Sequence, residues 1–90
     1  MLNAVKLALR ITTTAYDDEI QALIDAAYAD LGIVGLDSII LMNNPLYVQA
    51  VKTYVRMNFG SPSDYDRLKR SYDEQKAQMQ SASGYGGGIV

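Results

Sequence analysis

The chain has 90 residues, a net charge of −2 and a hydrophobic fraction of 49%, so it forms one domain with a thin core, burying about 60–65% of the surface that the unfolded chain exposes. It contains neither cysteine nor histidine, which excludes disulfides, the usual structural zinc sites and Ser-His or Cys-His catalysis. The acidic balance disfavours nucleic-acid binding through phosphate neutralisation. The N-terminal stretch is too short and too charged for a signal peptide, and no apolar run approaches the roughly 20 residues of a membrane span. We therefore expect a protein of the cytosol, or of an assembly built there.

The first half of the chain predicts a short helix and then a long one. Residues 2–10 read as a short amphipathic helix, which the β-branched stretch "ITTT" ends. Residues 15–31 give the strongest helix signal in the chain. Thr14 is placed to cap this helix, three consecutive acids fill its first turn, and Gly32 is placed to end it. Its apolar stripe recurs at three- and four-residue steps: Ile20, Leu23, Ile24, Ala27 and Leu31.

Residues 33–43 form an apolar connector whose conformation the pattern leaves open. The run "IVGLDSIILMNN" fits a short buried strand or a single helical turn, because periodicity does not separate the two over so few residues. We favour a helical turn around residues 37–41 in an otherwise irregular segment. Packing on its own domain and packing on a neighbour both stay open for this segment.

Two further helices complete the pattern. Asn44 and Pro45 mark the start of the first, as an N-cap followed by proline at the first helical position, and Gly60 ends it. Ser61 is placed to cap the second, which is expected to fade near residue 81. Its apolar side chains fall on heptad-like positions: Tyr65, Leu68, Tyr72 and Met79. Four tyrosines on the apolar faces of these helices are expected in the core or at its rim: Tyr47, Tyr54, Tyr65 and Tyr72.

The predicted fold is all-α: a small bundle of three main helices with a short leading N-terminal helix and a flexible C-terminal tail. Residues 1–82 are the expected helical domain, and residues 83–90, "SGYGGGIV", the glycine-rich tail. Many chain ends are frayed without a role. Apolar residues separated by glycines also suit an arm that becomes ordered on a partner, and both interpretations stay open.

The charged side chains have a simple structural explanation. Divalent-cation sites collect oxygens from several turns or loops, whereas the acids of residues 17–19 are consecutive and fan out around a helix start, where they complement the helix dipole. The mixed charges of the last helix, including an expected pair between Asp66 and Arg70, suit a solvated helix with weak local pairs. The competing interpretation is an intersubunit surface. No pattern indicates an active site or a cofactor, so we expect a binding or assembly module and not an enzyme.

The order of these signals resembles a known family. The segments "VKLALRI", "DDEIQALIDAAYADLGI", "NPLYVQAVKTYVRMNFG" and "YDRLKRSYDEQKAQM" together are similar to the head–tail connector (adaptor) family of tailed bacteriophages over about residues 2–80. The junction between "LRI" at residues 9–11 and "DDE" at residues 17–19 is the most distinctive part of this likeness.

The resemblance implies a helical structural protein of the virion, assembled in the host cytoplasm and located in the neck between capsid and tail. Its copies would form a ring beneath the portal, commonly with twelvefold symmetry, that extends the DNA channel and offers a platform to a stopper or tail-completion protein. DNA would pass without sequence-specific binding. The expected partners are therefore further copies of the chain, the portal protein and the stopper or tail protein, with no cofactor and no membrane.

Two sets of residues are the expected contacts in such an assembly. The first is a subunit interface in which basic residues of one copy face acidic residues of the next: Tyr16, Asp17, Asp18, Glu19, Arg67, Lys69 and Arg70. The second would dock on the portal or another partner, with glycines giving reach and apolar residues giving anchors: Gly84, Tyr85, Ile89 and Val90.

The alternative is a small helical DNA-binding or regulatory protein, because a helix, a short turn and a helix occur at "MNFGSPSDYDRLKR". A recognition helix there would carry Asp64, Asp66 and Arg67 towards the groove. Two of these three side chains are carboxylates, which phosphates repel.

Overall fold

The computed structural model describes residues 1–83, and in this part of the chain every regular element is a helix, as the sequence predicts. Five helices follow one another: α1 (Leu2–Leu9), α2 (Asp17–Leu31), α3 (Ser38–Met42), α4 (Pro45–Asn58) and α5 (Tyr65–Ser83). The helical turn expected around residues 37–41 is confirmed as α3. The main helices and the short leading helix also lie where the apolar periodicity places them.

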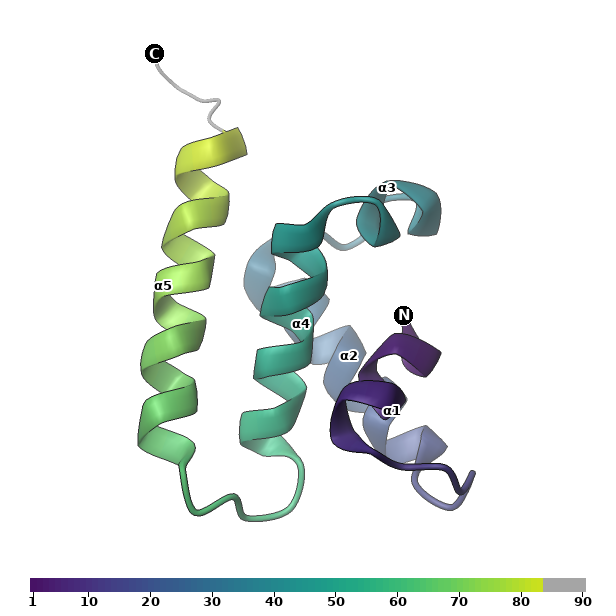
Figure 1. Ribbon diagram of the computed structural model, residues 1–90. Coiled ribbons are helices and arrows are strands. Elements are labelled where there is room, and N and C mark those ends of the chain that lie inside the picture. The colour runs from purple at the N-terminus through teal and green to yellow at the C-terminus, as the bar shows by residue number, and fades with distance from the viewer. Residues whose placement is uncertain (84–90) are drawn as a thin grey trace.

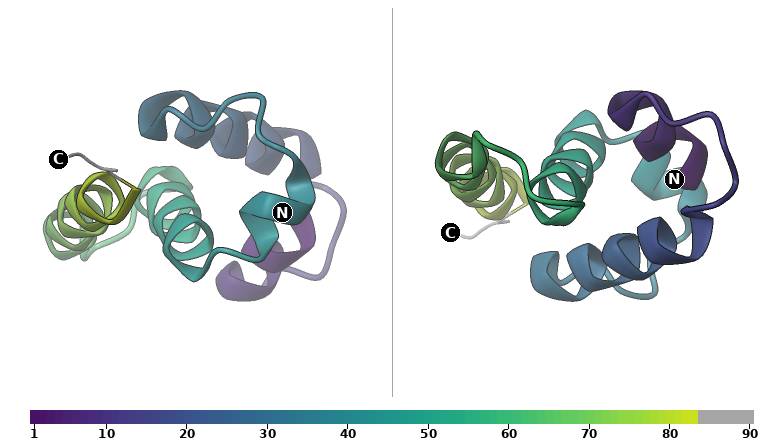
Figure 2. Two further views of the ribbon diagram at one scale, coloured as in Figure 1. Left: turned by 90° about the horizontal axis from the view of Figure 1, so that it is seen from above. Right: turned by 90° about the horizontal axis from the view of Figure 1, so that it is seen from below.

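Helix α4 lies at the centre of the molecule. It contacts all four other helices, while α1 also contacts α2. Figure 1 shows α5 running alongside α4 on one side, with α1 and α3 on the other. The views from above and below in Figure 2 show α2 on a further side of α4. The arrangement is elongated, with principal extents of 45 × 29 × 17 Å. Helix α5 and the pair α1 and α3 therefore form opposite edges of the molecule.

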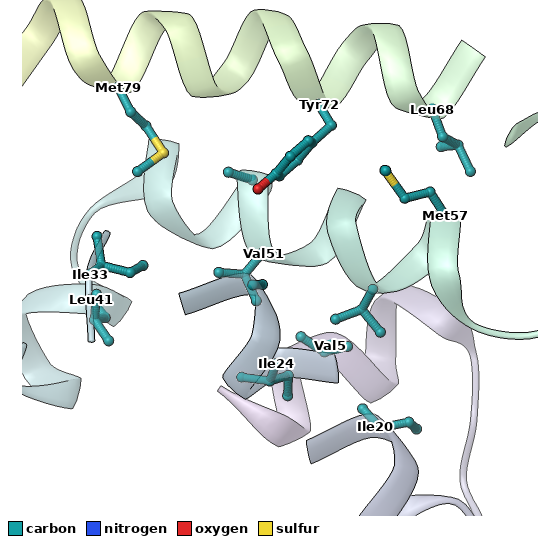
Figure 3. Close-up of a cluster of buried hydrophobic side chains, with 13 residues drawn as sticks. Val5, Ile20, Ile24, Ile33, Leu41, Val51, Met57, Leu68, Tyr72 and Met79 are labelled. Atoms are coloured by element: carbon teal, nitrogen blue, oxygen red, sulfur yellow. The ribbon is translucent and has the colours of Figure 1, made fainter. Parts of the chain in front are cut away.

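The core is a single cluster between α2, α4 and the inner face of α1. Ile20 and Ile24 of α2 are fully buried against Val51 and Val55 of α4, and Val5 of α1 closes the cluster (Figure 3). Residues three and four apart lie on one face of a helix, so the stripe in the sequence becomes one buried surface. Towards α5 the cluster continues through four more side chains: Met57, Leu68, Tyr72 and Met79.

The C-terminal end of α2 and the N-terminal end of α4 have the capping residues that the sequence predicts. Gly32 follows α2 with a φ of 71°, the left-handed conformation that glycine adopts without strain. Asn44 precedes α4, and its side-chain oxygen accepts hydrogen bonds from the N–H groups of Leu46 and Tyr47 at 3.1 and 3.5 Å, with Pro45 in the first turn. Both predicted signals are confirmed.

Two predicted caps are wrong. Helix α2 is preceded by Tyr16 without a side-chain cap, because the chain turns at residues 14–16 and the N–H of Ala15 donates to the hydroxyl of Thr13 at 3.2 Å. Thr14 therefore lies too early to cap it. Helix α5 begins at Tyr65 and not after Ser61, since the chain first reverses at Gly60, whose φ is 70°.

The expectation that Tyr65 lies in or near the core is also wrong, while the three other tyrosines on the apolar faces are confirmed. Tyr72 is buried, and Tyr47 and Tyr54 are packed against the core cluster. Tyr65 is 41% exposed, because it occupies the first turn of α5, beyond the part of the helix that reaches the core.

Candidate functional site

One of the three carboxylates at the start of α2 forms an ion pair within the chain. The Nζ of Lys6 in α1 lies 2.7 Å from a carboxylate oxygen of the half-buried Asp17, which ties α1 to α2. Asp18 and Glu19 are exposed. The ring of Tyr16 is 47% exposed and contacts Phe59 edge-on at a centroid distance of 5.6 Å. Two carboxylates and part of one aromatic ring therefore remain available at this end of the molecule.

Two of the three basic side chains at the start of α5 form ion pairs with nearby carboxylates, one with the residue just before the helix and one within it. Arg67 bonds to the carboxylate of Asp64, and this bond lowers the pKa of that carboxyl below its usual value. The Nζ of Lys69 lies 2.8 Å from Asp73, which raises the pKa of the amine. Exposed ion pairs of this kind contribute little to stability. Their side chains can therefore exchange partners at low cost.

The predicted pair between Asp66 and Arg70 is wrong. The exposed ion pairs here are instead Arg67 with Asp64 and Lys69 with Asp73. In the part of the chain that the structure describes, Arg70 has no ion-pair partner. Among Arg67, Lys69 and Arg70, the guanidinium of Arg70 is therefore the charge without an ion pair in the described residues.

The acidic and basic groups lie at the same end of the molecule but on opposite edges. In Figure 1 both α2 and α5 begin at the lower end, and Figure 2 shows α4 between those two starts. The seven side chains predicted for the subunit interface are therefore divided into two separate surfaces: Tyr16, Asp17, Asp18 and Glu19 on one edge, and Arg67, Lys69 and Arg70 on the other.

A polar contact that the sequence did not indicate holds α5 against the end of α2. The hydroxyl of Tyr72 donates to the carboxylate of Asp30 at 2.5 Å, and the Nζ of Lys76 lies 3.4 Å from the same oxygen. The bond from Tyr72, more than the charge of Lys76, holds the pKa of Asp30 below its usual value. Burial raises the pKa of Tyr72, so this hydroxyl stays a donor at physiological pH.

This contact makes stability depend on pH in acid. The pKa of Asp30 is lower in the folded chain than in the unfolded one, so the ionised carboxylate favours folding. The stabilisation is present above the unfolded value of about 4 and is lost as pH falls through the lowered folded pKa. We expect denaturant titrations between pH 7 and pH 2 to show a smaller acid loss in Tyr72→Phe than in the wild type. An identical loss of stability in both chains would show that the hydrogen bond from Tyr72 to Asp30 does not contribute to the pH dependence.

Five exposed large apolar side chains lie on α3 and the loop before it, in the segment for which the sequence left packing on a neighbour open. The α3 patch consists of five large aliphatic side chains that are 41–69% exposed: Val34, Leu36, Ile39, Ile40 and Met42. Within the same segment Ile33 and Leu41 face the core (Figure 3). A five-residue helix buries one side only, so the other apolar side chains of this run stay outside.

Among residues 1–83 no group of three carboxylates is arranged to hold a metal ion, and no helix is long and apolar enough to cross a membrane. The docking residues predicted in the C-terminal segment, Gly84, Tyr85, Ile89 and Val90, lie outside the described residues.

These features define a small helical module with exposed carboxylates at the start of α2, exposed arginine and lysine side chains of mixed-charge surroundings on α5, and exposed apolar side chains on α3 and the loop before it. Residues 1–86 match the family model described as phage connector protein. The chain belongs to this family, which confirms the resemblance seen in the sequence. It is a family of virion structural proteins that assemble with the portal and other phage proteins, and not a family of enzymes. No curated protein and no solved structure matches the chain.

Proposed function

We propose that this connector forms a ring beneath the portal of the capsid, extends the DNA channel and provides the platform on which a stopper or tail-completion protein docks. The ring takes the rotational symmetry of the portal, twelvefold in the common case. Assembly takes place in the host cytoplasm, and residues 1–82 act as the ring-forming domain. The C-terminal segment of residues 83–90 adds docking contacts to the portal or another partner through Gly84, Tyr85, Ile89 and Val90.

One observation carries the ring proposal: complementary charges lie on opposite edges of one chain. A head-to-tail contact joins different surfaces of two copies and repeats until the ring closes. The acidic start of α2 and the basic start of α5 lie at the same end of the molecule, so two copies side by side bring them together. The acidic balance of the chain favours passage of DNA without retention.

Charge reversal tests this contact. We expect the double variant Arg67→Glu and Arg70→Glu to lose assembly with the portal at physiological ionic strength, because like charges then face each other across the contact. The basic pair is exposed, so circular dichroism and thermal unfolding should change little. Assembly is measured by co-sedimentation with the portal oligomer.

Two control variants make this result specific. Asp18→Lys and Glu19→Lys in the same chain as the reversed arginines should restore assembly, since the charges are then exchanged across the contact. Lys52→Glu changes the charge by the same amount per site on α4, away from both groups, and should assemble normally. Normal assembly of the Arg67→Glu and Arg70→Glu chain would contradict the proposed contact between the start of α5 and the start of α2 of the next copy.

A further inference from the structure

Arg10, directly after α1, has a left-handed backbone although it is not a glycine. Its φ and ψ are 60° and 41°. Among the described residues, the other positions with a positive φ are all glycines: Gly32, Gly35 and Gly60. A side chain on a left-handed residue brings its Cβ close to the following carbonyl oxygen, and glycine avoids this cost in free energy. An arginine at such a position indicates that its side chain has a function that glycine does not supply.

That function does not lie within the described part of the chain. The backbone N–H of Arg10 donates to the carbonyl of Leu7 at 3.1 Å, and that of Ile11 donates to the carbonyl of Lys6 at 3.0 Å, which closes the helix end. Glycine at position 10 would make the same backbone bonds. Arg10 is exposed, and its side chain has no ion pair with any described residue. Its guanidinium is therefore available to another chain.

Arg10 lies on the edge of the molecule that carries the acidic start of α2. It begins the loop of residues 10–16, which leads directly into α2 at the lower end of Figure 1. The other basic residue in the sequence before Lys52 is Lys6. The side chain of Lys6 is only 13% exposed and is paired with Asp17. On this edge Arg10 is thus the basic side chain that a second chain can bind.

The start of α5, on the other edge, carries an exposed carboxylate without an ion pair among the described residues. This residue is Asp66, whereas Asp64 and Asp73 are paired with Arg67 and Lys69. In the proposed ring the start of α5 faces the acidic start of α2 of the next copy. Asp66 alone would meet like charges there, which disfavours the contact. A cation on the facing edge is needed to balance it.

We propose that the guanidinium of Arg10 in one copy binds the carboxylate of Asp66 in the next copy of the ring. This inference rests on the proposed ring and adds a second charge pair, opposite in direction, to the pairing of the α5 arginines with the acids of α2. A guanidinium and a carboxylate form two parallel hydrogen bonds, which fix an orientation as well as a distance. Two pairs of opposite direction favour one placement of the neighbours, because a shifted placement brings like charges together.

Arg10→Gly separates stability from assembly, because the two should change in opposite directions. Glycine relieves the left-handed strain, so we expect the midpoint of thermal unfolding to rise by a few degrees. The variant should need an at least tenfold higher concentration than the wild type to half-saturate the portal oligomer in co-sedimentation. Lys52→Gln, which removes one positive charge from α4, should bind like the wild type. A lower unfolding midpoint for Arg10→Gly, or binding equal to that of the wild type, would overturn the inference.

Exchange of the two charges identifies the partner residue. Arg10→Glu and Asp66→Arg should each weaken binding to the portal oligomer, and the chain that carries both should recover it. Glu74 is a matched control, since it is exposed on the same helix about two turns further on and has no ion pair among the described residues. Arg10→Glu combined with Glu74→Arg should not recover binding. Recovery with Glu74→Arg, or no recovery with Asp66→Arg, would overturn the pair.

The same measurements distinguish this inference from the proposed function. Failure of the wild-type chain to bind the portal oligomer would contradict the proposed ring itself. Wild-type binding without recovery in the charge-exchanged chain would overturn only the pair of Arg10 and Asp66. Normal portal binding by Arg10→Gly, together with loss of a wild-type affinity for short duplex DNA, would overturn it in favour of a contact between Arg10 and DNA phosphate.

Discussion

Ile24→Ala is expected to lower the free energy of unfolding by about 3–4 kcal/mol, one of the two largest single effects in this chain. Ile24 is fully buried at the centre of α2, in the cluster shared with α1 and α4. Removing most of its side chain loses apolar burial and leaves a cavity that neighbouring helices fill only in part. Urea unfolding followed by circular dichroism measures the change, and a domain of this size has little stability to spare.

Two control substitutions identify the cause. Ile24→Val removes a single methylene at the same site and should cost about 1 kcal/mol. Ile39→Ala removes the same atoms as Ile24→Ala from an exposed position and should change stability by less than about 0.5 kcal/mol. Equal losses for Ile24→Ala and Ile39→Ala would contradict the placement of the core between α2 and α4.

Tyr72→Ala is expected to cost about 3–4 kcal/mol, because this residue holds α5 to the rest of the domain. Its ring is buried and packs edge-on against Tyr54 at a centroid distance of 5.4 Å. Its hydroxyl reaches Asp30 at the end of α2. Loss of the ring therefore removes packing against α4 and the polar contact to α2 together. Urea unfolding gives the total, and amide hydrogen exchange should locate the largest loss of protection in α5.

Tyr72→Phe separates the two contributions. It keeps the ring and removes only the hydroxyl, so it should cost about 1 kcal/mol, the usual net value of one hydrogen bond. Asp30 is exposed enough for water to replace the lost donor, which keeps the cost low. A loss as large as that of the alanine variant would mean that the hydrogen bond to Asp30, and not the packed ring, holds α5 in place.

The sequence predicted the helices well because apolar residues at helical spacing determine where they form. The stripe of Ile20, Ile24 and Ala27 recurs at helical spacing, and all three are buried in α2. The pair Asn44 and Pro45 fixes the start of α4 through a side-chain cap and a missing N–H. Where several candidate caps lie close together, as in the threonine run before α2 and around Ser61, residue type alone does not choose between them. The choice depends on where the chain must turn to let the helices pack.

The contact surfaces were less predictable, for a different reason. Sequence shows that Arg67 and Lys69 are basic and exposed on a helix, but not that each lies beside its own carboxylate. It also gives no sign that Asp30 and Tyr72, 42 residues apart, meet. The α3 patch was hidden because a short apolar run reads the same whether its side chains face inward or outward. These features depend on tertiary placement, which periodicity does not encode.

The mass of the portal oligomer, measured by native mass spectrometry with and without the chain, tests the proposed connector role most directly. With the purified portal protein of the same phage, we expect the mass to rise by one connector chain per portal subunit, in a single step without intermediate stoichiometries, because ring contacts make binding cooperative. A portal oligomer whose mass is unchanged by an excess of folded chain would contradict a portal-bound ring.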